Sequence, residues 1–151
     1  MRKLALLTLP VAIALGAASV ASADSSGAIA TRHAYFKSLG FQMKKMGEIA
    51  KSFDPAAAKA QAVEFESILK TDFKTLFPEG TSAKDIPADN GAKPEIWTNF
   101  DDFLAKEAAF KAAGAELVAA AQGTDAKAFG AAMGKTGGTC KACHDDYRLP
   151  Q

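Results

Sequence analysis

The residues best suited to chemistry are two cysteines and a histidine near the C-terminus. Cys140 and Cys143 are the only cysteines of the chain, and His144 directly follows the second. The spacing C-x-x-C-H is typical of covalent attachment of c-type haem, in which each thiol forms a thioether with a haem vinyl group. On a helix the two thiols share one face, and His144, four residues after Cys140, leaves the same face and can reach the iron. The motif therefore predicts one covalently bound haem c with His144 as an axial ligand.

Three other uses of this motif are less favoured. A thioredoxin-like redox pair usually opens a helix after a strand, whereas this pair is predicted near the end of a helix in a chain without strands. A disulfide would strain cysteines three residues apart on a helix and would leave His144 without a role. A structural zinc site needs four ligands, and the motif supplies three, with His33 the only other histidine of the chain.

The first 23 residues have the pattern of a secretory signal peptide. Two basic residues precede an apolar run over 4–20, and Ala21-Ser22-Ala23 offers the small residues at which a signal peptidase cuts. The apolar run is too short for a membrane-spanning helix. We therefore expect cleavage after residue 23 and export of residues 24–151 to the periplasm as a single domain without a membrane span.

Composition and charge narrow the fold and the partners. The full chain has a formal net charge of +1, which falls to about −1 without the two basic residues of the signal peptide. Acidic and basic residues are interspersed, so neither nucleic-acid binding nor a basic membrane-surface helix is supported. Alanine is abundant, β-branched residues are scarce, and no stretch alternates as a half-buried strand does. The domain is predicted to be all-α.

Periodicity and helix-ending residues predict four amphipathic helices, over about 26–53, 55–77, 94–122 and 125–148. A loop rich in Pro, Gly, Ser, Asp and Asn over about 78–93 should cross one end of the domain. These lengths predict an antiparallel four-helix bundle with one long crossover loop and the haem near the C-terminal helix.

The first and last predicted helices carry the residues that would face the haem. In the last helix, Gly137-Gly138 should mark a kink or a close approach of the backbone to something flat. In the first helix, Arg32 is the one polar member of an otherwise apolar stripe. The stripe comprises Ile29, Arg32, Phe36, Leu39, Met43, Met46, Ala50 and Phe53.

The chain resembles cytochrome c prime and its low-spin relatives, the class II c-type cytochromes. The resemblance rests on C-K-A-C-H-D-D-Y-R at 140–148 in the last helix, and on R-H-A-Y-F at 32–36 in the first. Further matches are L-F-P at 76–78 and I-W at 96–97. It covers essentially all of residues 24–151.

The resemblance implies roles for single residues. Cys140 and Cys143 would anchor the haem and His144 would be the proximal iron ligand. Arg32 would pair with a haem propionate, which would explain a charge on an apolar stripe. Arg148 would be the basic residue beside the proximal imidazole.

The distal side of the iron departs from family members that have a sixth ligand. Those members place a methionine from the first helix on the iron, but the matching position here is Phe36, which cannot ligate. Met43 and Met46 lie further along the same stripe, where methionine commonly fills core gaps. Met43 is preferred over Met46 if a thioether binds the iron. His33 lies beside the stripe and is expected to be exposed at the helix edge.

These expectations favour a one-electron carrier that exchanges electrons with redox partner proteins. The alternative is a five-coordinate protein that binds nitric oxide or carbon monoxide, with Phe36 guarding the distal face. An enzyme has little support, because no Ser/His/Asp, paired-carboxylate or phosphate-loop pattern is present. The resemblance also implies homodimers through the first two helices, an arrangement common in the family.

Overall fold

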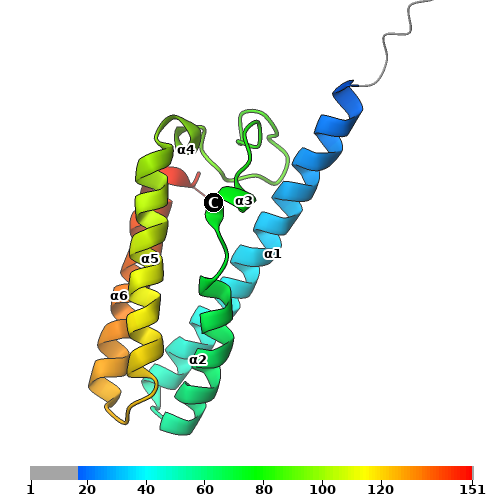
Figure 1. Cartoon of the computed structure of the whole chain (residues 1–151). Coiled ribbons are helices and arrows are strands. Elements are labelled where there is room, and N and C mark those ends of the chain that lie inside the picture. The colour runs from blue at the N-terminus through cyan, green and yellow to red at the C-terminus, as the bar shows by residue number, and fades with distance from the viewer. Residues whose placement is uncertain (1–16, 151) are drawn as a thin grey trace, which may run out of the picture.

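The computed structural model describes residues 17–150, and their side chains from Ser25 onward. Four long helices lie side by side, and two short helices sit at one end of them (Figure 1). Each long helix packs against two of the others, in a ring in which α1 contacts α2, α2 contacts α5, α5 contacts α6, and α6 contacts α1. The all-α antiparallel four-helix bundle is therefore confirmed. The six helices are α1 (Ala17–Lys51), α2 (Pro55–Leu69), α3 (Phe73–Leu76), α4 (Glu95–Thr98), α5 (Phe100–Ala120) and α6 (Ala126–Tyr147).

Helix α1 starts earlier than the sequence indicates. Its predicted start near residue 26 was wrong, because the helix already begins at Ala17 and projects beyond the bundle (Figure 1). Residues 1–16 of the predicted signal peptide lie outside the described residues, so the signal peptide stays a prediction. Between residues 17 and 150, no helix combines the length and apolar character needed to cross a bilayer.

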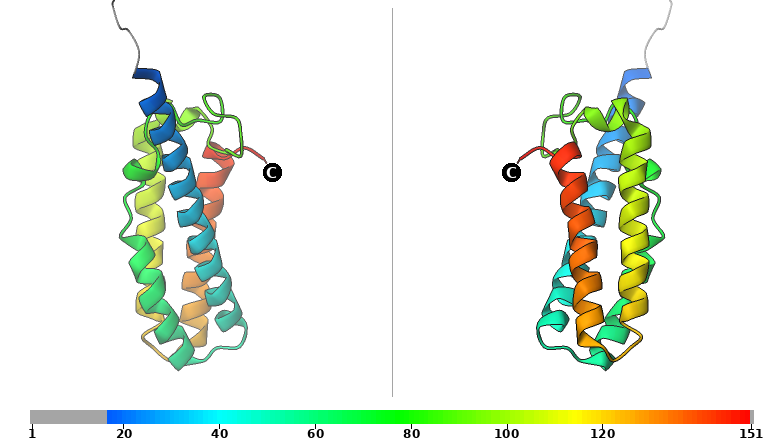
Figure 2. Two further views of the ribbon diagram at one scale, coloured as in Figure 1. Left: turned by 90° about the vertical axis from the view of Figure 1, so that its right-hand side faces the viewer. Right: turned by 90° about the vertical axis from the view of Figure 1, so that its left-hand side faces the viewer.

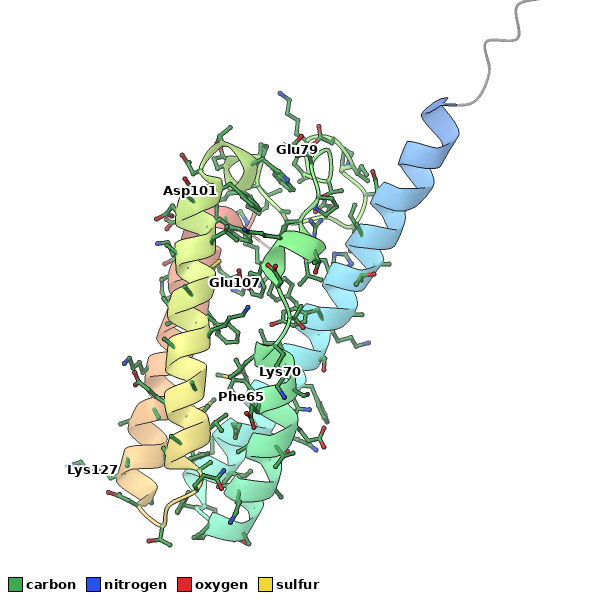
Figure 3. The ribbon with its side chains drawn as sticks, in the orientation of Figure 1. Phe65, Lys70, Glu79, Asp101, Glu107 and Lys127 are labelled. Carbon is green, nitrogen blue, oxygen red and sulfur yellow. The ribbon has the colours of Figure 1, made fainter. Side chains whose placement is uncertain are left out.

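The second predicted helix is in fact two helices, so a continuous helix over 55–77 was wrong. Helix α2 ends at Leu69, and α3 restarts after a three-residue break. The Asp72 side chain accepts the Lys74 N–H at 2.9 Å, and the Glu107 carboxylate of α5 accepts the Phe73 N–H at 3.0 Å. Figure 3 shows Glu107 between α5 and the α3 segment. These acceptors satisfy the first free N–H groups of α3, which stabilises a new helix start at this point.

The third predicted helix is also interrupted. It was expected to run unbroken from Pro94, but Asn99 leaves the helical conformation, with φ −125° and ψ 45°, and separates α4 from α5. The Asn99 carbonyl nevertheless accepts the Phe103 N–H at 3.0 Å. The chain therefore changes direction here without losing the helical hydrogen bonds that follow.

Helix α6 and the crossover loop agree with the sequence. Asp125 caps α6 by accepting the Lys127 N–H at 2.8 Å and the Ala128 N–H at 3.1 Å. The helix continues without a break through Gly137-Gly138. The loop after α3 crosses the end of the bundle and lies beside the C-terminal segment (Figure 2), where Ala92 and Arg148 form an isolated antiparallel bridge.

The core is rich in aromatic rings and differs between the two ends of the bundle. Near the α1–α2 connection Phe129 is fully buried against Phe53, and in the middle of the bundle Phe65 is fully buried against Phe110. Towards the crossover loop, Phe73, Phe77 and Phe103 form edge-on and tilted contacts with centroids 4.7 to 6.2 Å apart. This second cluster forms one wall of a cavity.

Candidate haem-binding site

Helix α6 places the C-x-x-C-H motif in its last two turns. The C-terminal cap is Arg148, whose N–H donates to the His144 carbonyl at 3.1 Å. The end of the crossover loop holds this end of the helix, because the Lys93 N–H donates to the Tyr147 carbonyl at 3.1 Å and the Leu149 N–H to the Gly91 carbonyl at 2.8 Å. The motif therefore sits on a helix end that is attached to the rest of the domain.

The motif lines a cavity of about 700 Å³, within the range typical of sites for small ligands and cofactors. Its apolar wall is supplied by Leu39, Phe73, Phe77, Ile96, Phe103 and Phe110. Seven residues singled out in the sequence also line it, namely Arg32, Phe36, Met43, Cys140, Cys143, His144 and Arg148. The fold thus gathers residues from both ends of the chain around one space.

The two cysteines are free thiols. The Cys140 Sγ–H donates to the Thr136 carbonyl at 3.5 Å. Burial raises the pKa of both thiols, that of Cys143 to about 11. A thioredoxin-like pair has a lowered thiol pKa, so these thiols do not have the character of a reactive redox pair.

His144 lies at the cavity rim. Partial burial lowers the pKa of His144, and the nearby Arg148 guanidinium lowers it further, while Asp145 opposes the shift. The neutral imidazole, the form that binds metal ions, is therefore favoured at neutral pH. The described residues contain no group of three or more His, Cys, Asp or Glu side chains arranged to hold a metal ion.

Arg32 is a buried charge, with 3% of its surface exposed. Its Nη1 donates to Thr81 Oγ1 at 3.3 Å, and its Nη2 donates to the Thr81 carbonyl at 3.1 Å and to Asn90 Oδ1 at 2.9 Å. The guanidinium carbon also lies 4.7 Å from the centre of the Phe77 ring, as in a cation–π contact. Burial lowers the pKa of Arg32, but an arginine remains charged at neutral pH. Among the ion pairs of residues 25–150, none includes Arg32.

The residues considered for the distal side differ in position. Phe36 is half-buried, and its ring contacts those of Tyr35, Phe73 and Phe77 at centroid distances of 5.0, 5.6 and 6.1 Å. Met43 is half-buried and lines the cavity. Met46 is fully buried in the core and is not among the lining residues. The structure therefore puts Met43, but not Met46, beside the cavity.

Gly137 also lines the cavity, and no atom lies within 4 Å of the position that a Cβ would occupy there. This placement fits the expectation that the backbone at the glycine pair closely approaches something flat. Gly138 is exposed and does not line the cavity.

Sequence reasoning missed several polar residues around the site. Asn90 and Thr81, from the crossover loop, hold Arg32. Lys106 of α5 lines the cavity and pairs with Asp146 at 2.8 Å. At the rim, Asp89 lies 3.7 Å from His33, whose expected exposure at the helix edge is confirmed. Loop residues and a single lysine on an amphipathic helix carry no periodic signal, so the pattern alone could not identify them.

The sequence and the structure both have close matches. The family model described as "Cytochrome C'" matches residues 27–148. A cytochrome c' of Cereibacter sphaeroides is 40% identical over 99% of this chain and 99% of its own length. The structure of a cytochrome c' from Rhodobacter sphaeroides matches with a TM-score of 0.78 and 38% identity, covering 84% of this chain and 98% of that one.

A further solved structure was determined with a ligand. It is a nitric oxide complex of a variant of cytochrome c prime from Alcaligenes xylosoxidans, with 29% identity and a TM-score of 0.73, and it covers 83% of this chain and 97% of that one. With the cavity, the haem-attachment motif and these matches together, the chain belongs to the cytochrome c prime family of c-type haem proteins.

Proposed function

We propose that the chain carries one haem c, bound covalently through Cys140 and Cys143, with His144 as the axial iron ligand. The observation that carries this proposal is that these three side chains share one cavity with the buried Arg32. The residues present fit the group in three further respects. Both thiols are free, the cavity wall is largely apolar, and the backbone at Gly137 is open to the cavity.

The polar residues of the cavity have separate tasks in this proposal. Arg32 offers a positive charge that forms no ion pair with a carboxylate among the described residues, and so suits a haem propionate. Arg148, beside His144, favours the neutral imidazole. The iron of the bound haem would supply one-electron chemistry. The chain's own residues bind and orient the ring and exclude water from it.

We infer that the protein is a one-electron carrier rather than an enzyme. A rigid helical bundle around the ring limits reorganisation when the oxidation state changes, and an apolar cavity wall favours the less charged reduced state. Electrons would be exchanged with redox partner proteins in the periplasm, to which the predicted signal peptide would direct residues 24–151. A covalently attached haem suits an exported protein because it cannot be lost to the medium.

A second candidate function is binding of small gaseous ligands such as nitric oxide or carbon monoxide. Phe36 favours it, since a ring at the cavity wall cannot ligate iron but can restrict access by size. The nitric oxide complex of the Alcaligenes xylosoxidans relative also supports it. Met43 favours the opposite state, in which a thioether completes the coordination.

The optical spectrum of the reduced protein, with and without carbon monoxide, distinguishes these states. We would compare the wild type with Met43→Leu, and use Met46→Leu as the control because Met46 is a core residue away from the cavity. Low-spin bands that disappear only in Met43→Leu would establish ligation by Met43 and favour the carrier. High-spin bands and rapid carbon monoxide binding in the wild type would instead favour the gas-binding protein.

We also propose a homodimer through α1 and α2. Phe41 of α1 is 55% exposed and Val63 of α2 is 63% exposed, and both are large apolar side chains on neighbouring helices. Burial of such side chains against a second copy would stabilise the dimer. Light scattering of Phe41→Glu and Val63→Glu tests this proposal. A dimeric wild type and monomeric variants are expected, and a monomeric wild type would contradict the proposal.

A further inference from the structure

The crossover loop holds the buried Arg32 through hydrogen bonds. Its hydrogen-bond acceptors are a hydroxyl, a carbonyl and an amide oxygen, all of them uncharged. A buried guanidinium is usually compensated by a carboxylate, because an unpaired charge is costly to remove from water. Here the loop supplies hydrogen bonds to Arg32, but none of its described carboxylates forms an ion pair with it, including Asp89, which lines the same cavity.

Asn90 is the centre of this arrangement, because its amide uses its full hydrogen-bonding capacity. Its Oδ1 accepts from Arg32 Nη2 at 2.9 Å and from the Ala92 N–H at 3.1 Å. Its Nδ2 donates to the Thr81 carbonyl at 3.1 Å and to the Ile86 carbonyl at 3.0 Å. An amide has two donors and two acceptor positions, and all four are satisfied.

These four bonds also determine which way the amide faces. Two carbonyls lie on the Nδ2 side and two N–H donors lie on the Oδ1 side, so a flipped amide would oppose like groups on both sides. An aspartate would likewise direct a carboxylate oxygen at two carbonyls. The site therefore selects a neutral amide whose oxygen is directed at Arg32.

We propose that Asn90 is a positioning residue that holds the Arg32 guanidinium towards the cavity without neutralising it, and thereby raises the reduction potential of the bound haem. This inference rests on the proposed haem function. A fixed positive charge near the ring stabilises the reduced state, which carries one more electron. A carboxylate in place of Asn90 would cancel that charge and would compete with the haem for Arg32.

The test is a double-mutant cycle on the one-electron potential, measured by spectroelectrochemical titration of Asn90→Ala, Arg32→Gln and the double variant. Arg32→Gln should lower the ferrous-to-ferric ratio at a given applied potential by about tenfold. This change corresponds to a reduction potential lower by about 59 mV for a one-electron couple. Asn90→Ala should move the potential in the same direction by a smaller amount. In the Arg32→Gln background, Asn90→Ala should cause no further shift, because its effect acts through Arg32.

Asn99→Ala is the matched control, since the Asn99 side chain makes no capping hydrogen bond and lies outside the cavity lining. Its potential should equal that of the wild type. If Asn90→Ala does not fold, hydrogen exchange of loop residues 81–92 in haem-loaded Arg32→Gln provides a second measurement. Loss of Arg32 should accelerate exchange in this loop, and unchanged exchange would contradict the proposal.

The failure of this inference can be distinguished from failure of the haem proposal. Intact mass of every variant shows first whether one haem is attached. A wild type without haem would overturn the proposed function. If haem is attached, an unchanged potential in Asn90→Ala, or an equal shift in both backgrounds, would overturn the role of Asn90 alone.

Discussion

Two adjacent glycines in the middle of α6 allow the placement of the haem to be tested by stability. No atom lies within 4 Å of the Cβ position at Gly137 or at Gly138, but only Gly137 lines the cavity. Alanine in a helix interior is favoured over glycine by about 0.8–1 kcal/mol. Nothing opposes this gain at the exposed Gly138, so Gly138→Ala should raise the melting temperature by roughly 4 °C.

Gly137→Ala should behave differently in the haem-loaded protein, because its methyl group would enter the space that the proposed haem would occupy. An extra methyl group in a filled site typically costs about 1–3 kcal/mol, which offsets or exceeds the gain in helix propensity. We therefore expect Gly137→Ala to melt at or below the wild-type temperature, and its Soret band to shift. Calorimetry and the optical spectrum of both variants measure this. Equal stabilisation by the two alanines would refute the packing of the ring against Gly137.

Three further predictions concern the bundle and its loop. Phe65→Ala should lower the free energy of unfolding by about 3–5 kcal/mol, because Phe65 is fully buried, whereas Glu66→Ala at the exposed next position should have little effect in urea titrations. Asp54→Ala should lower the free energy of unfolding by about 1 kcal/mol, because the Asp54 carboxylate caps α2. A decrease of less than a few tenths of a kcal/mol would contradict that role. Hydrogen bonds donated by Ser82 lower the pKa of Asp85. The stabilisation is therefore present above the ordinary pKa of aspartate and lost as pH falls through the lowered value. Asp85→Asn should thus destabilise the protein at pH 7, and the difference from the wild type should shrink as the pH falls below the ordinary pKa of aspartate.

Much of the fold can be predicted from the sequence, because the turn residues and the periodicity of apolar residues agree with the packing of the helices. Periodicity predicts a last helix over about 125–148, and the structure confirms it within one or two residues, with Asp125 as its cap. The Pro, Gly and Asn content of residues 78–93 likewise predicts the crossover loop. The stripe on α1 correctly separates buried residues such as Leu39 and Met46 from the exposed face.

The errors in the helix bounds lie where local sequence signals are weak or where a distant residue contributes to the local structure. The break between α2 and α3 depends on Glu107, which lies 34 residues after the N–H that it accepts. The Thr71-Asp72 pair is a weak helix-restart signal that an apolar periodicity through Phe73 and Leu76 outweighs. The break at Asn99 has no side-chain cap to reveal it.

The same limit applies to the site. The C-x-x-C-H motif and Arg32 could be identified from residue type and spacing. The partners of Arg32 could not, because the bonds from Arg32 to Thr81 and Asn90 span 49 and 58 residues. The preference for Met43 over Met46 follows from its shorter distance along the helix from Phe36, and the structure shows that Met46 belongs to the core.

Covalent attachment of one haem is the central claim, and intact mass tests it most directly. The protein should be matured in an export compartment that contains haem-ligation machinery, together with a control in which Cys140 and Cys143 are replaced by alanine. We expect the wild-type mass to equal residues 24–151 plus one haem, resistant to acid-acetone extraction, and the control to lack covalent haem. A wild-type protein with no haem, or with a haem that acid-acetone removes, would contradict the account.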